Sequence, residues 1–253
     1  PSRIGGFFGE PANLKKQVDK YFKNRHIETS IIQKLPGGIK HYQWYLMFMP
    51  LAVEFFDLSN FDVVISDASA FAKGVITKPD CLHICYCHTP TRYLWSDTHQ
   101  YINDLKYNKW FKKIISLFLS RVRIWDRVAA DRVDFFIANS KTVQERIKKY
   151  YRRESTVIYP PVETDKYSVR DLSNQKLEEK YFLAGCRLAR YKRIDLVVEA
   201  FKKLGNDYRL KIFGDGFDAK RLKKMAAGAT NIEFLGRVSE EEKIKLFENA
   251  QAF

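Results

Sequence analysis

The sequence predicts an α/β protein with parallel sheets, organised in two domains. Short apolar segments typical of buried strands alternate with segments of helical periodicity through most of the chain. The polar stretch 163–180 interrupts this alternation, which then starts again, and we interpret the stretch as a linker. A chain of 253 residues is long enough for two modest domains, for which we expect the ranges 1–165 and 166–253.

Four strands and a connecting helix are expected in the first domain. The strand segments are FDVVIS from Phe61, CLHICYC from Cys81, VDFFIANS from Val133 and STVIYPPV from Ser155. Pro160 and Pro161 end the last strand because proline cannot donate to the hydrogen-bond ladder. The segment KTVQERIKKYY follows the third strand and has the periodicity of a helix.

The second domain repeats the order of strand and helix three times. The segments are YFLAGC, IDLVVEAFKKL, RLKIFGDG, DAKRLKKMAAGA, NIEFLG and SEEEKIKLFENA. A further strand is expected to begin at Ala252. A doubly wound sheet that ends at this point leaves its last helix without a partner, so we expect the sequence to be part of a longer chain.

The charge of the chain indicates an anionic partner. The net charge is +14, and residues 101–160 hold 14 Lys and Arg against 6 Asp and Glu. Such a balance fits a nucleic acid, a membrane surface or a small molecule that bears phosphate. No apolar run approaches the ~20 residues that a membrane-spanning helix needs.

The basic segment 105–127 interleaves cations with large apolar residues. As a helix it would present an apolar stripe beside a basic face, a pattern suited to an anionic lipid surface. The alternative is that the apolar stripe packs on the core of the domain. We expect no nucleic acid, because the segment contains no recognisable recognition motif.

The stretch HICYCHTPTRYLW contains several potential metal ligands. On a strand, His83, Cys85 and Cys87 share a face with Cys81, but neighbours on one face are roughly 6.5–7 Å apart. A zinc site needs donors within ~2.3 Å of one point, normally from two separated pairs. We therefore expect no metal, and we interpret the cysteines as reduced, buried apolar side chains of a cytosolic protein.

His88 follows the same strand at its carboxyl end. Ligands of open α/β folds bind beyond the carboxyl ends of the strands. A histidine there can orient a hydroxyl group or donate a hydrogen bond near a reacting centre. The alternative is a structural histidine that caps the strand, and the spacing of residues leaves both readings open.

A second group of candidate residues lies in the later half of the chain. Arg187 and Lys192 stand between a strand and a helix, where two cations and a helix N-terminus can hold a diphosphate. The alternative is a solvated basic turn. Gly214 and Gly216 flank Asp215 at the next strand-to-helix turn, where glycine lets a backbone approach a ligand. No Walker A motif, GxGxxG fingerprint or Asp-x-Asp pair occurs, so we expect metal-independent chemistry.

Several of these segments together resemble a known family, the retaining GT-B glycosyltransferases of family four. The likeness is greatest to mannosyltransferase-like members that build bacterial and archaeal surface polysaccharides, and it extends from about Thr29 to the chain end. The segments that carry it are, in order, LHICYCHTPTRYLW, WDRVAADRVDFFIANSKTVQERIKKYY, VIYPPVETDKY, RLARYKRIDLVVEAF, IFGDG and NIEFLGRVSEEEKIKLF.

The resemblance implies two Rossmann-like domains that face each other across a cleft. The first would hold the acceptor and the second the nucleotide sugar, with no metal or other cofactor. His88 would lie near the donor sugar, and Arg187 and Lys192 would bind the donor diphosphate and stabilise the leaving group. The nucleotide pocket would be lined by Gly214, Asp215, Gly216, Arg237 and Val238.

The expected function is therefore that of a cytoplasmic hexosyltransferase, peripheral on the inner face of the cell membrane. It would transfer mannose from GDP-mannose, with retention, to a lipid-linked or polysaccharide acceptor. The alternative is a non-catalytic module that binds nucleotide or membrane. Two parts of the family pattern are expected to be missing, namely the N-terminal strand with its glycine-rich loop, since Gly5 and Gly6 follow no predicted strand, and a glutamate motif that would lie beyond Phe253.

Overall fold

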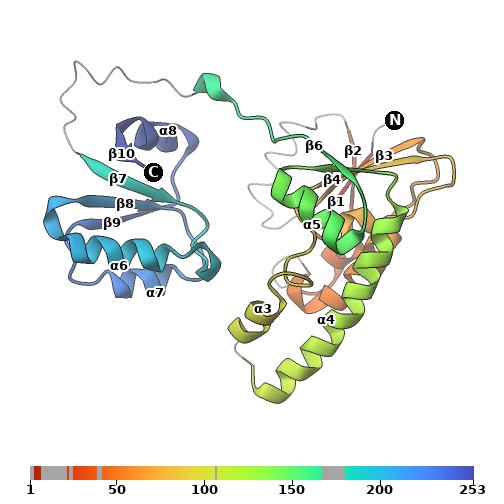
Figure 1. Cartoon of the computed structure of the whole chain (residues 1–253), viewed down its shortest axis with the longest axis horizontal. Coiled ribbons are helices and arrows are strands. Elements are labelled where there is room, and N and C mark those ends of the chain that lie inside the picture. The colour runs from red at the N-terminus through yellow and green to blue at the C-terminus, as the bar shows by residue number, and fades with distance from the viewer. Residues whose placement is uncertain (1–2, 7–21, 23–24, 39–41, 106, 167–179) are drawn as a thin grey trace. The chain divides into compact units, whose positions relative to one another are not determined.

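The computed structural model describes residues 3–6, 22, 25–38, 42–105, 107–166 and 180–253 (Figure 1). The chain divides into two compact units, Pro1–Pro161 and Val162–Phe253. Each unit contains a four-stranded parallel sheet with helices packed on it, so the expected α/β class is confirmed. In the described part of the chain, no helix combines the length and the apolar character that crossing a bilayer requires.

The main sheet of the first unit has the strand order β3-β4-β5-β6. These strands are β3 (Val63–Ala68), β4 (Leu82–Cys87), β5 (Phe135–Ala138) and β6 (Ser155–Val157). All neighbouring strands are parallel, with Ala68 opposite Cys87 and Cys87 opposite Ala138. The carboxyl ends of β3, β4 and β5 therefore meet at one edge of the sheet.

Helices and short 3-10 turns surround this sheet. The helices are α2 (Met49–Glu54), α3 (Thr98–Asp104), α4 (Lys109–Ala129) and α5 (Lys141–Tyr151). The 3-10 turns are η1 (Ile31–Lys34), η2 (Tyr42–Phe48), η3 (Ala72–Gly74) and η4 (Ala130–Arg132). Helix α5 begins where the sequence predicts, because the Ser140 hydroxyl accepts a hydrogen bond from the Val143 backbone N–H.

The buried face of this sheet is apolar and includes the cysteines of β4. His83, Cys85 and Cys87 alternate with more exposed residues along the strand, as the period of two requires. Cys85 and Cys87 pack with the apolar face of α5, including Ile147 and Tyr151. The expectation that these cysteines are buried and unpaired is confirmed.

The structure contains a strand near the N-terminus that the sequence did not predict. Strand β1 (Arg3–Gly6) pairs in parallel with β2 (His26–Thr29) and forms a separate two-stranded sheet. The strand was missed because β1 includes Gly5 and Gly6, and glycine supplies no apolar side chain by which a strand can be recognised. The family's glycine-rich loop, also expected to be missing, would fall on residues 7–21, which lie outside the described part of the chain.

The second unit contains the parallel sheet β10-β7-β8-β9. Its strands are β7 (Tyr181–Gly185), β8 (Arg209–Phe213), β9 (Ile232–Gly236) and β10 (Ala250–Ala252). Its helices are α6 (Ile194–Leu204), α7 (Ala219–Met225) and α8 (Glu240–Asn249), with 3-10 turns η5 (Thr164–Lys166), η6 (Arg190–Lys192) and η7 (Gly205–Asp207). Helices α6 and α7 cover one face of the sheet and α8 the other (Figure 1).

The order of these strands creates a switch point at β7. The chain moves outward from β7 to β8 and β9 on one side, and β10 then pairs with the other side of β7. Ligands of open α/β sheets bind at such a point, beyond the carboxyl ends of the strands. The connection 186–193, which contains Arg187 and Lys192, starts at this position.

Candidate functional site

His88 lies at the carboxyl end of β4 and forms a pair with Asp67. The ring Nε2 of His88 is 2.5 Å from Oδ1 of Asp67 on the neighbouring strand β3. The imidazole is 43% exposed and the carboxylate 73%. The ring of Tyr86 meets the His88 ring edge-on, with centroids 5.4 Å apart. The strand end thus presents an oriented imidazole to solvent.

Asp67 was missed by sequence reasoning, although a signal was available. It comes directly after the expected strand FDVVIS and is the last residue but one of β3. Strand β3 is the neighbour of β4 in the sheet. Parallel strands place their carboxyl ends at one edge, so a carboxylate that ends one strand can reach a histidine that ends the next.

A buried carboxylate, Asp126, anchors the loop that carries His88. Asp126 lies on α4 and is fully buried. Its Oδ1 accepts hydrogen bonds from Thr91 Oγ1 at 3.0 Å and from Lys73 Nζ at 2.5 Å. Its Oδ2 accepts from the indole N–H of Trp95 at 2.7 Å and from the Tyr151 hydroxyl at 2.9 Å. Two side chains of the stretch that follows His88 are therefore fixed to α4.

The ammonium group that neutralises Asp126 is itself enclosed. The Lys73 side chain is 1% exposed, and its Nζ also donates to the Ala70 carbonyl at 3.0 Å. The ring centroids of Trp125 and Tyr151 lie 5.8 and 5.0 Å from Nζ. Burial and the nearby Asp126 carboxylate raise the pKa of Tyr151, so its hydroxyl remains a donor. A buried charge pair is tolerated when every partner is hydrogen-bonded, as it is for Asp126.

His83, a potential metal ligand in the sequence, is a neutral residue of the core. Burial lowers its pKa. Its Nδ1 lies 3.3 Å from the Arg132 carbonyl and its Nε2 2.9 Å from the Ser66 hydroxyl. Because a carbonyl only accepts, Nδ1 carries the proton and Nε2 accepts from Ser66. Among the described residues, no cluster of His, Cys, Asp and Glu could hold a metal ion.

In the second unit, Arg187 and Lys192 are exposed on the connection between β7 and α6. Within the described residues, neither cation forms an ion pair, whereas Arg193 is paired with Asp195 and Arg190 approaches Asp218. The Lys192 ammonium lies 5.5 Å from the Tyr191 ring. Arg187 and Lys192 are thus cations that an incoming anion could bind without breaking an ion pair.

The N-terminus of α6 contributes less than the sequence suggested. Its N-cap residue Arg193 has a left-handed backbone and makes no side-chain cap. The first turn already contains Asp195, whose pKa is lowered chiefly by a hydrogen bond from Arg193. This carboxylate offsets the positive end of the helix, so the side-chain charges of Arg187 and Lys192 dominate.

The glycine turn after β8 packs against the backbone of that same connection. Gly214 has a φ of +113°, and a Cβ on it would lie 2.0 Å from the Cys186 carbonyl oxygen. A Cβ on Gly216 would lie 2.2 Å from the Leu188 carbonyl oxygen. The sequence indicated that these glycines let the backbone approach a ligand, and in the structure both positions also bring their turn close to the neighbouring loop of the protein.

The remaining candidate residues join this cluster of loops. Arg237 Nε lies 3.5 Å from Asp215 Oδ2, and the Gly214 N–H donates to the Gly236 carbonyl at 2.6 Å. The Leu188 N–H donates to the Asp215 carbonyl at 3.0 Å. Val238 is half-buried just after Arg237. The structure therefore brings Asp215 and Arg237 into contact and fastens their loops to the one that carries Arg187 and Lys192.

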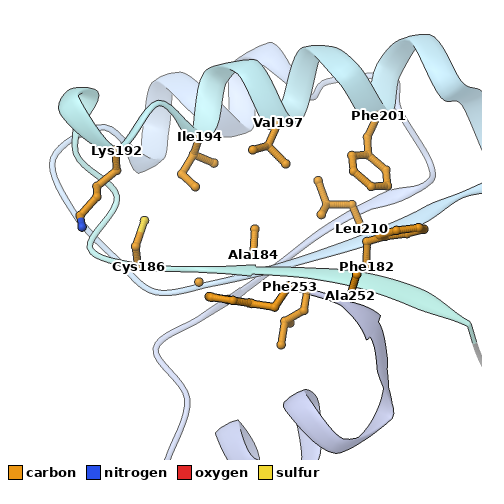
Figure 2. A pocket seen from close by; sticks show the side chains of 12 residues that line it. Phe182, Ala184, Cys186, Lys192, Ile194, Val197, Phe201, Leu210, Ala252 and Phe253 are labelled. Atoms are coloured by element: carbon orange, nitrogen blue, oxygen red, sulfur yellow. The ribbon is translucent and has the colours of Figure 1, made fainter.

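A pocket of about 400 Å³ opens between α6 and β7. Figure 2 shows Ile194, Val197 and Phe201 of α6 facing Ala184 of β7, while Lys192 stands at one end beside Cys186. Most of the lining is apolar, and the Lys192 ammonium supplies a cation at the carboxyl end of the strand. Burial raises the pKa of the Cys186 thiol, against the opposing effect of the Lys192 charge.

Two successive α/β units, each built on a parallel sheet, match the domain organisation of the GT-B class of fold. The chain matches the family model Glycosyltransferase Family 4 over residues 13–166. It also matches the model Glycosyl transferases group 1 over residues 166–253. The chain therefore belongs to the family 4 glycosyltransferases.

Two known proteins illustrate the likeness. The chain is 28% identical over 151 residues to the D-rhamnosyltransferase WbpZ of Pseudomonas aeruginosa, a match that covers 57% of this chain and 37% of that protein. It is also similar to the crystal structure of HepE from Anabaena in complex with UDP and glucose, with a TM-score of 0.56 and 14% identity. That match covers 94% of this chain and 62% of HepE, so the chain spans less than two thirds of either protein.

Proposed function

We propose that the chain acts in a glycosyltransferase that moves a hexose from a nucleotide sugar to an acceptor, with retention at the anomeric carbon. The first unit binds the acceptor and the second binds the nucleotide sugar. The observation that carries this proposal is the placement of two exposed cations, Arg187 and Lys192, which have no ion-pair partner in the described part of the chain, at the switch point of a parallel sheet.

The chemistry asked of these cations is electrostatic. Transfer breaks the bond between the anomeric carbon and a phosphate oxygen and forms a bond to the acceptor hydroxyl oxygen, whose proton passes to the departing diphosphate. Negative charge grows on the departing diphosphate, and preformed cations stabilise that charge. Arg187 can hold two phosphate oxygens at once, whereas Lys192 supplies a point charge. Asp215, Arg237 and Val238 with the two glycines form the wall for the nucleoside.

His88 is proposed to contact the transferred sugar near its reacting carbon. Its exposed ring, oriented by Asp67, supports this role over that of a strand cap, because the ring bonds a carboxylate instead of a backbone group of the strand. No metal or other cofactor is needed in this proposal, since the charge of the diphosphate is met by side chains.

For the donor we propose a hexose of mannose configuration, with GDP-mannose as the first to test. D-rhamnose, which WbpZ transfers according to its name, is mannose without its 6-hydroxyl group. UDP-glucose is the matched comparison, because HepE was crystallised with UDP and glucose. The acceptor is proposed to be a lipid-linked or polysaccharide glycan at the cytoplasmic face of the membrane.

Thermal-shift assays with GDP-mannose, UDP-glucose, GDP and UDP test the donor site. A donor at 100 times its dissociation constant should add about 2.7 kcal/mol to the stability of the chain. Arg187→Ala and Lys192→Ala should abolish most of this shift, whereas Lys203→Ala, at the far end of α6, should retain it. Donor binding unchanged in both variants would refute the diphosphate assignment. Binding without sugar transfer to any glycan acceptor would instead favour a non-catalytic nucleotide-binding module.

A further inference from the structure

Helix α4 has two apolar faces, and packing on the core accounts for one of them. The inward face contains Leu119, Val122 and Ala129, which are buried, together with Asp126. On the other side, four large apolar side chains are exposed, namely Trp110 (69%), Leu117 (62%), Ile124 (65%) and Val128 (52%). At 3.6 residues per turn, these four lie within an arc of roughly 40°.

Two cations lie in the same stripe. Lys113 and Arg121 are exposed. Along the chain, Lys113 lies between Trp110 and Leu117, and Arg121 lies between Leu117 and Ile124. Within the described residues, neither of them forms an ion pair. Their long aliphatic stems can lie along the apolar side chains while the charged groups reach outward. We call these six residues the outer stripe of α4.

The charge of α4 is one-sided. The helix contains six Lys and Arg residues and a single carboxylate, Asp126. That carboxylate is buried and paired with Lys73, so it contributes no negative charge to the surface. Lys109, one of these six, is exposed next to Trp110. The exposed surface of the helix is therefore apolar and positive, with an aromatic side chain near one end.

We propose that the outer stripe of α4 docks the first unit on a membrane surface that contains anionic phospholipid. An amphipathic helix that lies in a membrane interface needs an apolar face to enter the headgroup boundary and cations to meet lipid phosphates. The outer stripe supplies both over a helix of 21 residues. This inference rests on the proposed function, in that a lipid-linked acceptor places the substrate at this surface.

Other occupants fit the stripe less well. A second copy of the chain would place Lys113 and Arg121 against the cations of an identical helix, with no exposed carboxylate on α4 to pair with them. A nucleic acid would meet the cations but would leave Leu117, Ile124 and Val128 projecting from a binding face, where they have no role in contacting phosphate. A membrane interface accommodates both kinds of side chain.

Flotation with vesicles tests the docking surface. The chain should float with vesicles of phosphatidylcholine mixed with phosphatidylglycerol, weakly with phosphatidylcholine alone, and less at high salt. Leu117→Glu combined with Ile124→Glu should weaken binding at least tenfold. Lys113→Gln combined with Arg121→Gln should weaken it roughly 30-fold, given about 1 kcal/mol for each cation at an anionic surface.

Matched variants on the second unit provide the controls. Leu204→Glu changes a comparably exposed leucine, and Lys203→Gln with Lys223→Gln removes two exposed cations, so both should bind vesicles as the parent chain does. Brominated phospholipid should quench the fluorescence of Trp110, and this part of the quenching should be absent in Trp110→Phe. Vesicle binding that is equal in the stripe variants and the controls would overturn the proposal.

Two further measurements separate this proposal from its competitors. The lipid assignment would be overturned if the parent chain bound no vesicles and instead self-associated in a way that Leu117→Glu abolishes. It would also be overturned if the parent chain bound no vesicles and instead bound RNA or DNA in a way that Lys113→Gln with Arg121→Gln abolishes. The stripe variants should keep the full thermal shift with GDP-mannose or UDP-glucose. Absence of vesicle binding in the parent chain, with the donor shift present, refutes the docking surface alone, whereas absence of any donor shift in the parent chain refutes the proposed function.

Discussion

The Nε2 atom of His88 lies 2.5 Å from Oδ1 of Asp67, so the pair joins the carboxyl ends of two neighbouring parallel strands. The loop that continues from His88 is fastened to α4 through Thr91 and Trp95, which both donate to Asp126. The imidazole is therefore oriented on one side by a carboxylate and supported on the other by a loop with two anchored side chains. Such support is what a group that positions a substrate requires.

We expect Asp67→Asn to lower turnover roughly tenfold and to leave the affinity for the donor unchanged, because the ring of His88 loses its orientation. His88→Ala should lower turnover further, and adding Asp67→Asn to it should then have little additional effect. Steady-state kinetics and calorimetric donor binding on the complete enzyme measure the two quantities.

Asp62→Asn is the matched control for Asp67→Asn, since Asp62 is an exposed aspartate just before the same strand and is paired with Lys78 instead of a histidine. Its turnover should equal that of the parent enzyme. If Asp67→Asn and Asp62→Asn behaved alike, or if His88→Ala retained full turnover, His88 would be a strand cap.

Asp126→Ala should destabilise the first unit by about 3–5 kcal/mol, because it leaves the buried ammonium of Lys73 without its opposite charge. Lys73→Met combined with Asp126→Asn removes both charges and keeps an oxygen acceptor for Thr91. This double variant should therefore lose less stability than the sum of its single changes. Urea denaturation of the four proteins in the cycle measures the coupling.

An exposed ion pair supplies the comparison for Asp126. Lys148 and Glu154 form a surface pair at 3.2 Å, and Glu154→Ala should change the free energy of unfolding by less than about 1 kcal/mol. Additive effects of Lys73→Met and Asp126→Asn would show that the two buried groups do not depend on each other.

The strands and helices that position these residues could be predicted from the sequence because each depends on local pattern. The segment from Lys141 to Tyr151 has a polar cap before it and an apolar residue every fourth position, and it forms α5 over those residues. Strand β1 could not be predicted in this way, because two of its four residues are glycine and give no apolar pattern.

The candidate site could be predicted only in part, because its supporting contacts join distant segments. In the sequence, Asp126 is one acidic residue within a basic segment, but its spacing from Leu119, Val122 and Ala129 places it on the buried face of α4. A carboxylate on an apolar stripe is a signal for a buried partner, but the sequence alone does not identify Lys73 as that partner. Gly214 was recognised as a turn residue, whereas its neighbour, the Cys186 carbonyl, became visible only in the fold.

Gly214→Ala should disturb the proposed nucleotide-sugar site of the second unit more than an alanine at another glycine with positive φ would. Its new Cβ would lie 2.0 Å from the Cys186 carbonyl oxygen, so the connection that carries Arg187 and Lys192 must move. Gly228→Ala is the matched control, because Gly228 also has a positive φ but would meet no atom within 4 Å. We expect Gly214→Ala to cost about 1–3 kcal/mol more in the free energy of unfolding than Gly228→Ala, through overpacking. It should also weaken binding of GDP-mannose or UDP-glucose, whichever binds the parent chain, whereas Gly228→Ala should not. Equal stability and equal donor binding in the two variants would show that the contact between these loops does not hold the two cations in place.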